Sequence, residues 1–217
     1  MTNLESKKNI IFDLGNVVVD IDLNITLERF RKLGFERGGD FIGKYKQSGI
    51  FHDFEVGKIS ADDFVNGIKA HMNPNVSDKD VISAWNAIIG DYKEERITTI
   101  IKLKETHNVF LLSNTNELHI EACANRVPIV GTLSNLFDKV YYSYELNMSK
   151  PNKDIFEEVL RDANIKAEET LFLDDGLANV QTAKSLGIES WLVEFPDQWV
   201  PNMKELISSQ LSVSKKQ

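Results

Sequence analysis

Residues 9–20 read NIIFDLGNVVVD, an apolar run that reaches Asp13 and is followed by Gly15 and Asn16. Apolar and β-branched residues that stop at a turn are typical of a strand buried in a parallel sheet. Asp13 would then lie at the carboxyl end of that strand, where open parallel sheets bind their ligands. Because an aspartate at a strand end can equally cap the following turn, this stretch alone leaves both roles open.

From Asn108 onward, the sequence alternates between predicted strands and predicted helices. Apolar runs predict strands at residues 108–113, 139–143, 170–175 and 189–193. Helical patterns predict helices at residues 116–125, 152–163 and 177–186, after an earlier helix at residues 94–106. This alternation predicts an α/β fold with a doubly wound, Rossmann-like core, in which helices cover both faces of a parallel sheet.

Residues 23–90 contain helical patterns only. Apolar side chains at positions 23, 27, 30 and 33 have helical spacing, and Ser60 is followed three residues later by Asp63, an acidic variant of a capping box. A second helix start is predicted at Ser77, and no strand is predicted in this region. We therefore predict two domains: an α/β core formed by residues 1–22 and 91–217, and an inserted helical cap formed by residues 23–90.

Composition narrows the classes of partner. The chain has 217 residues with 42% hydrophobic content, enough for a buried core, and its net charge of −8 argues against nucleic acid as a partner. Cys123 is the single cysteine, so an internal disulfide is excluded and no Cys/His metal spacing exists. A polar N-terminus and the absence of an apolar run near ~20 residues predict a cytoplasmic protein with no membrane partner. We expect a monomer or a homodimer.

Four segments would carry polar groups to one edge of the predicted sheet: Asp13, Ser113–Asn114, Lys150 and Asp174–Asp175. Each segment has an ordinary alternative. Ser113 or Asn114 can cap a helix, and Lys150 can be a solvated surface residue. One of the two aspartates can cap the helix that follows them. Their order and spacing along the chain favour a shared site.

In this order the four segments resemble the motifs of the haloacid dehalogenase superfamily, in the subtype with an early-inserted helical cap. Residues 12–17, FDLGNV, together with residues 112–116, LSNTN, look most like the branch that includes the bacterial α-glucose-1-phosphate phosphatases. The resemblance implies a Mg²⁺-dependent phosphatase that hydrolyses a small phosphorylated metabolite, most readily a sugar phosphate. The reaction would pass through an aspartyl-phosphate on Asp13.

The resemblance also implies a metal site. Its ligands would be Asp13, the carbonyl of Gly15 and Asp175, with Asp174 as a second candidate or an outer partner. Mg²⁺ prefers such oxygen ligands. A carboxylate that attacks a phosphate is repelled by roughly 4 kcal/mol per charge pair at 4 Å, so Mg²⁺ and the Lys150 ammonium would supply the compensating charge.

The transferring phosphoryl group would have its own donors. Ser113 and the backbone N–H of Asn114 are predicted to hydrogen-bond to its oxygens, and Lys150 is predicted to bind it as well as to act in catalysis.

The sequence departs from most phosphatases of the superfamily at Gly15, where they carry a second aspartate as general acid and base. Such a group contributes about 10²–10⁴ in rate. Asp20 is our catalytic candidate in its place, with Asp22 and His52 as alternatives. A substrate with a good leaving group would need less protonation. A third reading is a catalytically weak or silent protein that binds a phosphorylated ligand. Dehalogenases also lack the second aspartate, but they use no metal, so the retained acidic pair argues against that chemistry.

Substrate choice is expected to lie in the cap. Residues 51–60 combine aromatics, His52 and Gly57 as a loop facing a site can, although Phe51 and Phe54 are as well explained as core residues. Contacts to a substrate hydroxyl are also possible from Asn116, Glu117 and His119, which otherwise belong to a helix surface.

Overall fold

The computed structural model describes residues 6–35 and 49–214. Its centre is a five-stranded sheet in the order β5-β4-β1-β6-β7, in which every neighbouring pair is parallel. The strands are β1 (Asn9–Phe12), β4 (Asn108–Ser113), β5 (Lys139–Tyr142), β6 (Thr170–Asp174) and β7 (Glu189–Leu192). The predicted parallel α/β core is confirmed, because β1 is paired on both sides and buried along its whole length.

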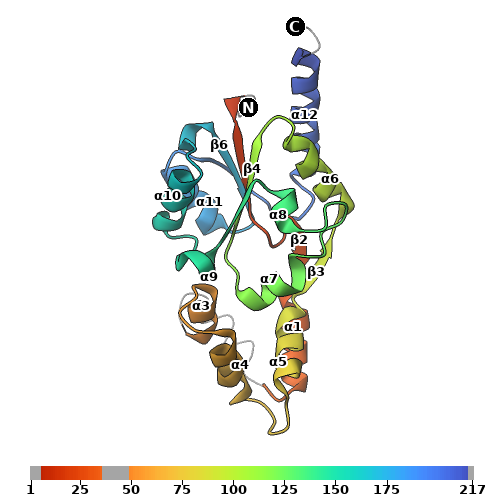
Figure 1. Ribbon diagram of the computed structural model, residues 1–217, viewed down its shortest axis with the longest axis vertical. Helices are drawn as coiled ribbons and strands as arrows, with labels where there is room; N and C mark the ends of the chain where they lie inside the picture. Colours follow the sequence, from red (N-terminus) through yellow and green to blue (C-terminus); the bar gives the residue numbers. More distant parts are fainter. Residues whose placement is uncertain (1–5, 36–48, 215–217) are drawn as a thin grey trace.

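Helices cover both faces of this sheet (Figure 1). One face packs against α6 (Glu94–Leu103) and α12 (Val200–Ser214), and the other against α10 (Lys153–Asp162) and α11 (Leu177–Ser185). Side chains along β1 alternate between the two layers: Ile10 and Phe12 join the cluster of α6 and α12, whereas Ile11 joins that of α10 and α11. This period of two is the ordinary consequence of strand geometry.

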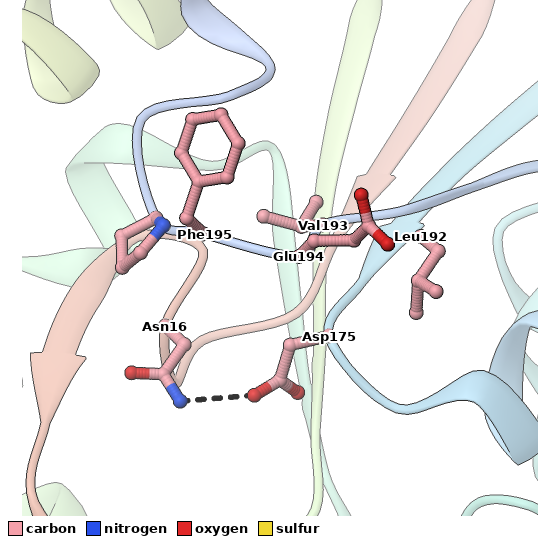
Figure 2. Close-up of a pocket in the computed structure, with 7 residues that line it drawn as sticks. Asn16, Asp175, Leu192, Val193, Glu194 and Phe195 are labelled. Atoms are coloured by element: carbon pink, nitrogen blue, oxygen red, sulfur yellow. Dashed lines mark hydrogen bonds between the residues drawn. The ribbon is translucent and has the colours of Figure 1, made fainter.

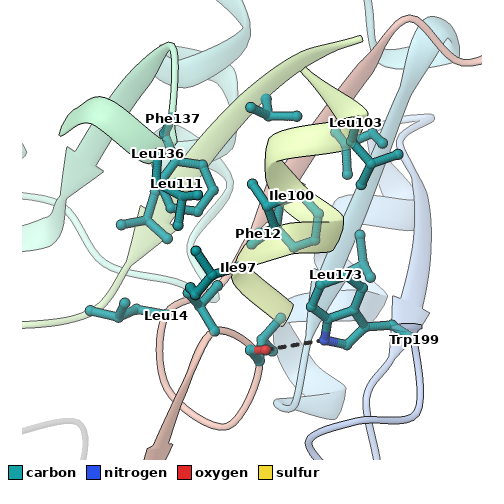
Figure 3. Packing of buried hydrophobic residues seen from close by; sticks show 14 of the residues in the cluster. Phe12, Leu14, Ile97, Ile100, Leu103, Leu111, Leu136, Phe137, Leu173 and Trp199 are labelled. Atoms are coloured by element: carbon teal, nitrogen blue, oxygen red, sulfur yellow. Dashed lines mark hydrogen bonds between the residues drawn. The ribbon is translucent and has the colours of Figure 1, made fainter. Parts of the chain in front are cut away.

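Phe12 occupies the centre of the first layer (Figure 3). Its ring lies 6.1 Å from that of Phe137 and 5.2 Å from that of Trp199. Ile97, Ile100 and further α6 side chains fill the same cluster. Shorter elements complete the core: α7 (Glu117–Cys123), α8 (Leu133–Leu136), α9 (Ser143–Leu146) and the 3₁₀ turn η2 (Ala167–Glu169).

In the described residues, which leave out 36–48, the helical region contains α1 (Leu23–Lys32), α3 (Ile50–Glu55), α4 (Ala61–Lys69) and α5 (Asp78–Asn86), and these helices lie beyond one end of the sheet in Figure 1. It has a hydrophobic cluster of its own, built on Phe30, Phe54, Phe64 and Trp85. Ser60 and Ser77 both form complete capping boxes, which confirms these two predicted helix starts. The division into two domains at the predicted residues stays a prediction.

One expectation for this region is wrong. Residues 89 and 90 belong to a strand, β3 (Ile89–Tyr92), which pairs antiparallel with β2 (Val19–Ile21). Each of these strands is short and only partly buried, so neither has the apolar run that marks a strand in a sequence. Their pairing comes from tertiary contact between segments about 70 residues apart. Within the described ranges, no helix has the length and apolar character that a membrane span requires.

We predict that Phe12→Ala lowers the free energy of unfolding by about 3–5 kcal/mol, because the cavity left beside Phe137 and Trp199 cannot fully collapse. Denaturant unfolding measures this. The matched control is Phe195→Ala, whose side chain is 59% exposed and whose loss should change stability by no more than about 0.5 kcal/mol. Equal losses in the two variants would contradict this packing.

Candidate active site

The parallel pairing of β1 with β4 and β6 brings three polar strand ends together. Phe12 is in register with Leu111 of β4 and with Leu173 of β6. Asp13 follows β1 and is held by a hydrogen bond from its N–H to the Leu173 carbonyl, at 2.9 Å. The ends of β4 and β6 therefore lie beside Asp13, as the sequence predicts.

Lys150 is buried between two of the carboxylates. Its ammonium donates to Asp13 Oδ1 at 2.8 Å, to Asp174 Oδ2 at 2.6 Å and to the Leu112 carbonyl at 3.0 Å. These bonds use all three N–H groups, and only 4% of the residue is exposed. Lys150 thus neutralises charge inside the site.

The backbone of Lys150 is held by Asn114. The Asn114 amide donates to the Lys150 carbonyl at 2.8 Å, and its Oδ1 accepts from the Lys150 N–H at 2.9 Å. This two-way contact ties the loop after β4 to the segment before α10. Ser113, at the end of β4, is 3% exposed. The predicted roles of Ser113 and Asn114 toward a phosphoryl group stay predictions.

Asp174 and Asp175 occupy different environments. Asp174 is fully buried, and its second oxygen accepts from the Gly176 N–H at 2.7 Å and from the Asn179 amide at 2.8 Å. Both Asp174 oxygens are thereby occupied by protein donors. Asp175 is exposed, and its carboxylate keeps one oxygen without a hydrogen bond to any described residue. The geometry favours Asp175 over Asp174 as a metal ligand.

Asp13, Asp174 and Asp175 can each present an oxygen within 4.8 Å of the others. A cluster of carboxylate oxygens with a single buried ammonium fits a hard divalent cation such as Mg²⁺. The Gly15 carbonyl, two residues after Asp13, stays a predicted further ligand. A Cβ at Gly15 would lie 3.0 Å from the Ile21 side chain, which fills the space beside it.

The charges in this cluster shift each other's protonation. Burial raises the pKa of Asp13 to about 7, and the neighbouring carboxylates of Asp174 and Asp175 add to the rise, while the Lys150 ammonium opposes it. Burial alone would lower the pKa of Lys150, but the carboxylates of Asp13 and Asp174 outweigh it and hold that pKa above its ordinary value. Bound cations stabilise the ionised form of nearby carboxylates.

Asn16 is a site residue that the sequence reasoning missed (Figure 2). Its amide donates to Asp175 Oδ2 at 2.9 Å, and its Oδ1 accepts from the Ile21 N–H at 3.3 Å. The backbone of Asn16 has a φ of 57°, a left-handed conformation that asparagine tolerates better than most residues. The Gly-Asn pair signals the turn in the sequence, but nothing in it signals the contact with Asp175, 159 residues away.

Asp20, the predicted proton donor, is engaged elsewhere. It lies on β2, where Oδ1 is 2.7 Å from Arg96 Nη1 and Oδ2 is 3.4 Å from Lys93 Nζ. It does not belong to the carboxylate cluster of the described residues. Asp22 caps α1 by accepting from the Asn24 N–H at 2.9 Å, and His52 lies half-buried on α3. None of these placements tests a role in proton transfer.

Ser143 is a second residue that the sequence reasoning missed. It is fully buried, and its hydroxyl accepts from the Thr115 N–H at 2.8 Å while lying 2.6 Å from the Glu55 carbonyl, to which it donates. It therefore links the loop that carries Asn114 to the end of α3. A lone serine after a strand gives no sequence signal for such a link.

Asn116, Glu117 and His119, the residues proposed to touch a substrate hydroxyl, contact the helical region. The His119 ring stacks on Trp85 of α5 at 4.6 Å, and the side-chain Oδ1 of Asn116 accepts from the Trp85 indole at 3.3 Å. Burial lowers the pKa of His119 to about 4. Glu117 accepts from the Ala61 N–H at 2.8 Å. Phe51 and Phe54 are buried in the cluster of the helical region, as their core interpretation predicts.

The family model described as haloacid dehalogenase-like hydrolase matches residues 7–187. A D-ribitol-5-phosphate phosphatase of Bacteroides thetaiotaomicron is 34% identical over 204 residues, covering 93% of this chain and 99% of the relative.

Solved structures give the same family. A haloacid dehalogenase family enzyme of Bacteroides thetaiotaomicron, in complex with magnesium and inorganic phosphate, is 36% identical with a TM-score of 0.79, covering 86% of this chain and 93% of that one. A predicted hydrolase of the same family from Porphyromonas gingivalis is 32% identical with a TM-score of 0.85, covering 93% and 98% of the two chains.

The buried ring of His119 predicts an acid-dependent loss of stability. In the folded protein the pKa of His119 lies below the ordinary value of 6.5, so the unfolded chain binds a proton at this residue more readily than the folded one. The stability that the neutral ring contributes to the fold is therefore complete above pH 6.5 and is lost as the pH falls toward 4. Between these two pH values, the free energy of unfolding would fall by up to about 1.4 kcal/mol per pH unit. Denaturant unfolding between pH 4 and 7 should show a shallower dependence for His119→Gln than for the wild type. Parallel curves would contradict this environment for His119.

Proposed function

Because this chain belongs to the haloacid dehalogenase-like hydrolase family, we propose that it is a Mg²⁺-dependent phosphatase acting on a small phosphorylated metabolite. One observation carries the proposal: Asp13, Asp174 and Asp175 converge at one edge of the sheet with the ammonium of Lys150 between two of them. Hydrolysis of a phosphoric monoester through a covalent intermediate needs a nucleophile and positive charge that offsets the anionic phosphate, and a divalent cation can supply that charge. The three carboxylates and the lysine can meet these needs together.

We further propose that the substrate is a phosphorylated sugar or polyol. The support is the 34% identity, over nearly the whole of both chains, to a relative named as a D-ribitol-5-phosphate phosphatase. The resemblance to the α-glucose-1-phosphate phosphatase branch stays a prediction. So do a cytoplasmic location and a monomeric or homodimeric state.

In the proposed reaction, Asp13 attacks phosphorus. A bond forms between a carboxylate oxygen and phosphorus, the ester bond breaks, and the leaving alkoxide takes a proton. Water then attacks the aspartyl-phosphate, which releases inorganic phosphate and restores Asp13. Mg²⁺, held by Asp13 and Asp175 with the Gly15 carbonyl, would neutralise charge on the phosphoryl oxygens and orient them.

The surrounding residues position these groups. Lys150 holds the Asp13 carboxylate in place and offsets its charge, which lowers the repulsion between Asp13 and a phosphate. Ser113 and the Asn114 N–H lie on the loop that Asn114 fixes to Lys150, and they would donate to the phosphoryl oxygens.

Because Gly15 offers no side chain, another residue must supply the proton to the leaving group. Asp20 stays our catalytic candidate, although its ion pair with Arg96 must open before it can protonate a leaving group. Asp22 and His52 remain alternatives. Gly15 is also the one observation that favours a second function, a weak or silent protein that binds a phosphorylated ligand, because glycine offers no proton.

The first test is phosphate release from a panel of sugar and polyol phosphates. We expect turnover with Mg²⁺, its loss in EDTA, and a fall of at least about a thousandfold in Asp13→Asn, which removes the attacking charge. The matched control, Asp62→Asn in the exposed first turn of α4, should retain the wild-type rate. Binding of substrate without release from any member of the panel would instead support the silent protein.

The second test concerns Asn16. We expect Asn16→Ala to weaken Mg²⁺ binding about 10–100-fold, because Asp175 loses the amide that orients it. Titration calorimetry with Mg²⁺ and no substrate measures this. Asn135→Ala, an exposed asparagine on α8, should bind Mg²⁺ as the wild type does. Unchanged affinity in Asn16→Ala would exclude a role for this hydrogen bond in the metal site.

A further inference from the structure

A pocket of about 400 Å³ opens beside the candidate metal ligand Asp175 (Figure 2). Asn16, Asp175 and residues 192–196 line it. We propose that this pocket binds the hydroxyl-bearing carbon chain of the phosphorylated substrate, with Glu194 accepting hydrogen bonds from hydroxyls and Phe195 packing against the C–H face of the chain. The inference rests on the proposed phosphatase function and adds a substrate contact from the core to those expected from the cap.

The position of the pocket follows from the sheet. Leu192 of β7 is in register with Asp174 of β6, and the Val193 N–H donates to the Asp174 carbonyl at 2.9 Å. The chain after β7 therefore leaves the sheet next to Asp175. A substrate whose phosphoryl group lies at the carboxylate cluster would reach this segment if its carbon chain extends past Asp175 toward β7.

The chain that follows the pocket residues is anchored by contacts with the loop after β1, with β2 and with α6. The Trp199 indole, buried to 1% exposure, donates to the Val17 carbonyl at 3.1 Å. Arg96, equally buried, donates from Nε to Asp197 Oδ1 at 2.7 Å and pairs with Asp20 through Nη1. The lining residues 192–196 lie between β7 and this anchored stretch, so we expect binding to lose little to ordering of the chain.

Two side chains in residues 194–199, those of Glu194 and Phe195, take no part in the contacts described above that anchor this segment. Gln198 accepts from the backbone N–H of Glu194 at 2.6 Å, and Asp197 and Trp199 make the contacts described above. The Glu194 carboxylate and the Phe195 ring are left exposed, the ring to 59%. A single exposed apolar residue is ordinary on a protein surface, but here it lines a pocket next to a candidate metal ligand.

The chemistry of these side chains limits the ligand class. A carboxylate is an acceptor, so it suits the O–H donors of a polyol, and an aromatic ring offers apolar area at low entropic cost. Glu194 and Asp175 together would repel a second anionic group on the ligand. The pocket therefore fits a neutral polyhydroxylated chain better than a second phosphate or a carboxylate.

The test compares D-ribitol 5-phosphate with methyl phosphate, which has no carbon chain to fill the pocket. We expect Phe195→Ala and Glu194→Gln each to lower kcat/KM for D-ribitol 5-phosphate about tenfold more than for methyl phosphate, mainly through KM. Phe195→Tyr should restore most of the loss. The matched controls are Ile129→Ala, whose side chain is 64% exposed, and Glu205→Gln on α12; both should keep the wild-type ratio.

A binding measurement separates this inference from the proposed function. Calorimetry with D-ribitol 5-phosphate and Mg²⁺ on Asp13→Asn, alone and combined with each pocket variant, reports on the pocket without turnover. Affinity about tenfold weaker in the pocket variants would support the inference. Pocket variants that bind as tightly as Asp13→Asn alone, or a wild type with no preference for D-ribitol 5-phosphate over methyl phosphate, would overturn it. Absence of phosphate release from every substrate would count against the phosphatase, whatever the binding result.

Discussion

The ammonium of Lys150, buried between the carboxylates of Asp13 and Asp174, is the interaction on which the site depends. Burying an isolated charge is costly, and each of these groups is tolerated because the others compensate it. Three neighbouring carboxylates with one ammonium still carry excess negative charge, so the cluster attracts a divalent cation. The same excess makes the cation necessary before an anionic phosphate can approach.

The order of the strands places Asp13 and Asp174 close enough for Lys150 to bind both. β1 lies between β4 and β6, so the chain that leaves each of these strands meets the others at one edge. Asn114 then holds the backbone of Lys150 from both sides, which fixes the lysine relative to β4. Further contacts extend outward from this centre: Asn16 joins Asp175 to the loop after β1, and Ser143 joins the loop after β4 to α3.

Much of this arrangement could be predicted from the sequence, because the strand ends are marked by patterns of a few neighbouring residues. Buried parallel strands are continuous apolar runs, and an acid or a serine at the end of such a run is visible without knowledge of the fold. This pattern predicts Asp13, Ser113 and the Asp174–Asp175 pair as site residues. The contacts of Asn16, Arg96 and Ser143 join residues distant in sequence, and no local pattern marks them. Asp20 shows the same limit, because its pairing with Arg96 is set by tertiary structure.

The central claim is that the carboxylate of Asp13 attacks phosphorus. Mass spectrometry of the protein, quenched in acid during turnover with Mg²⁺ and D-ribitol 5-phosphate, tests it most directly. The account predicts one phosphoryl group on the peptide that contains Asp13, and none when Mg²⁺ is withheld. Continued turnover with the phosphoryl group on a different residue would contradict it.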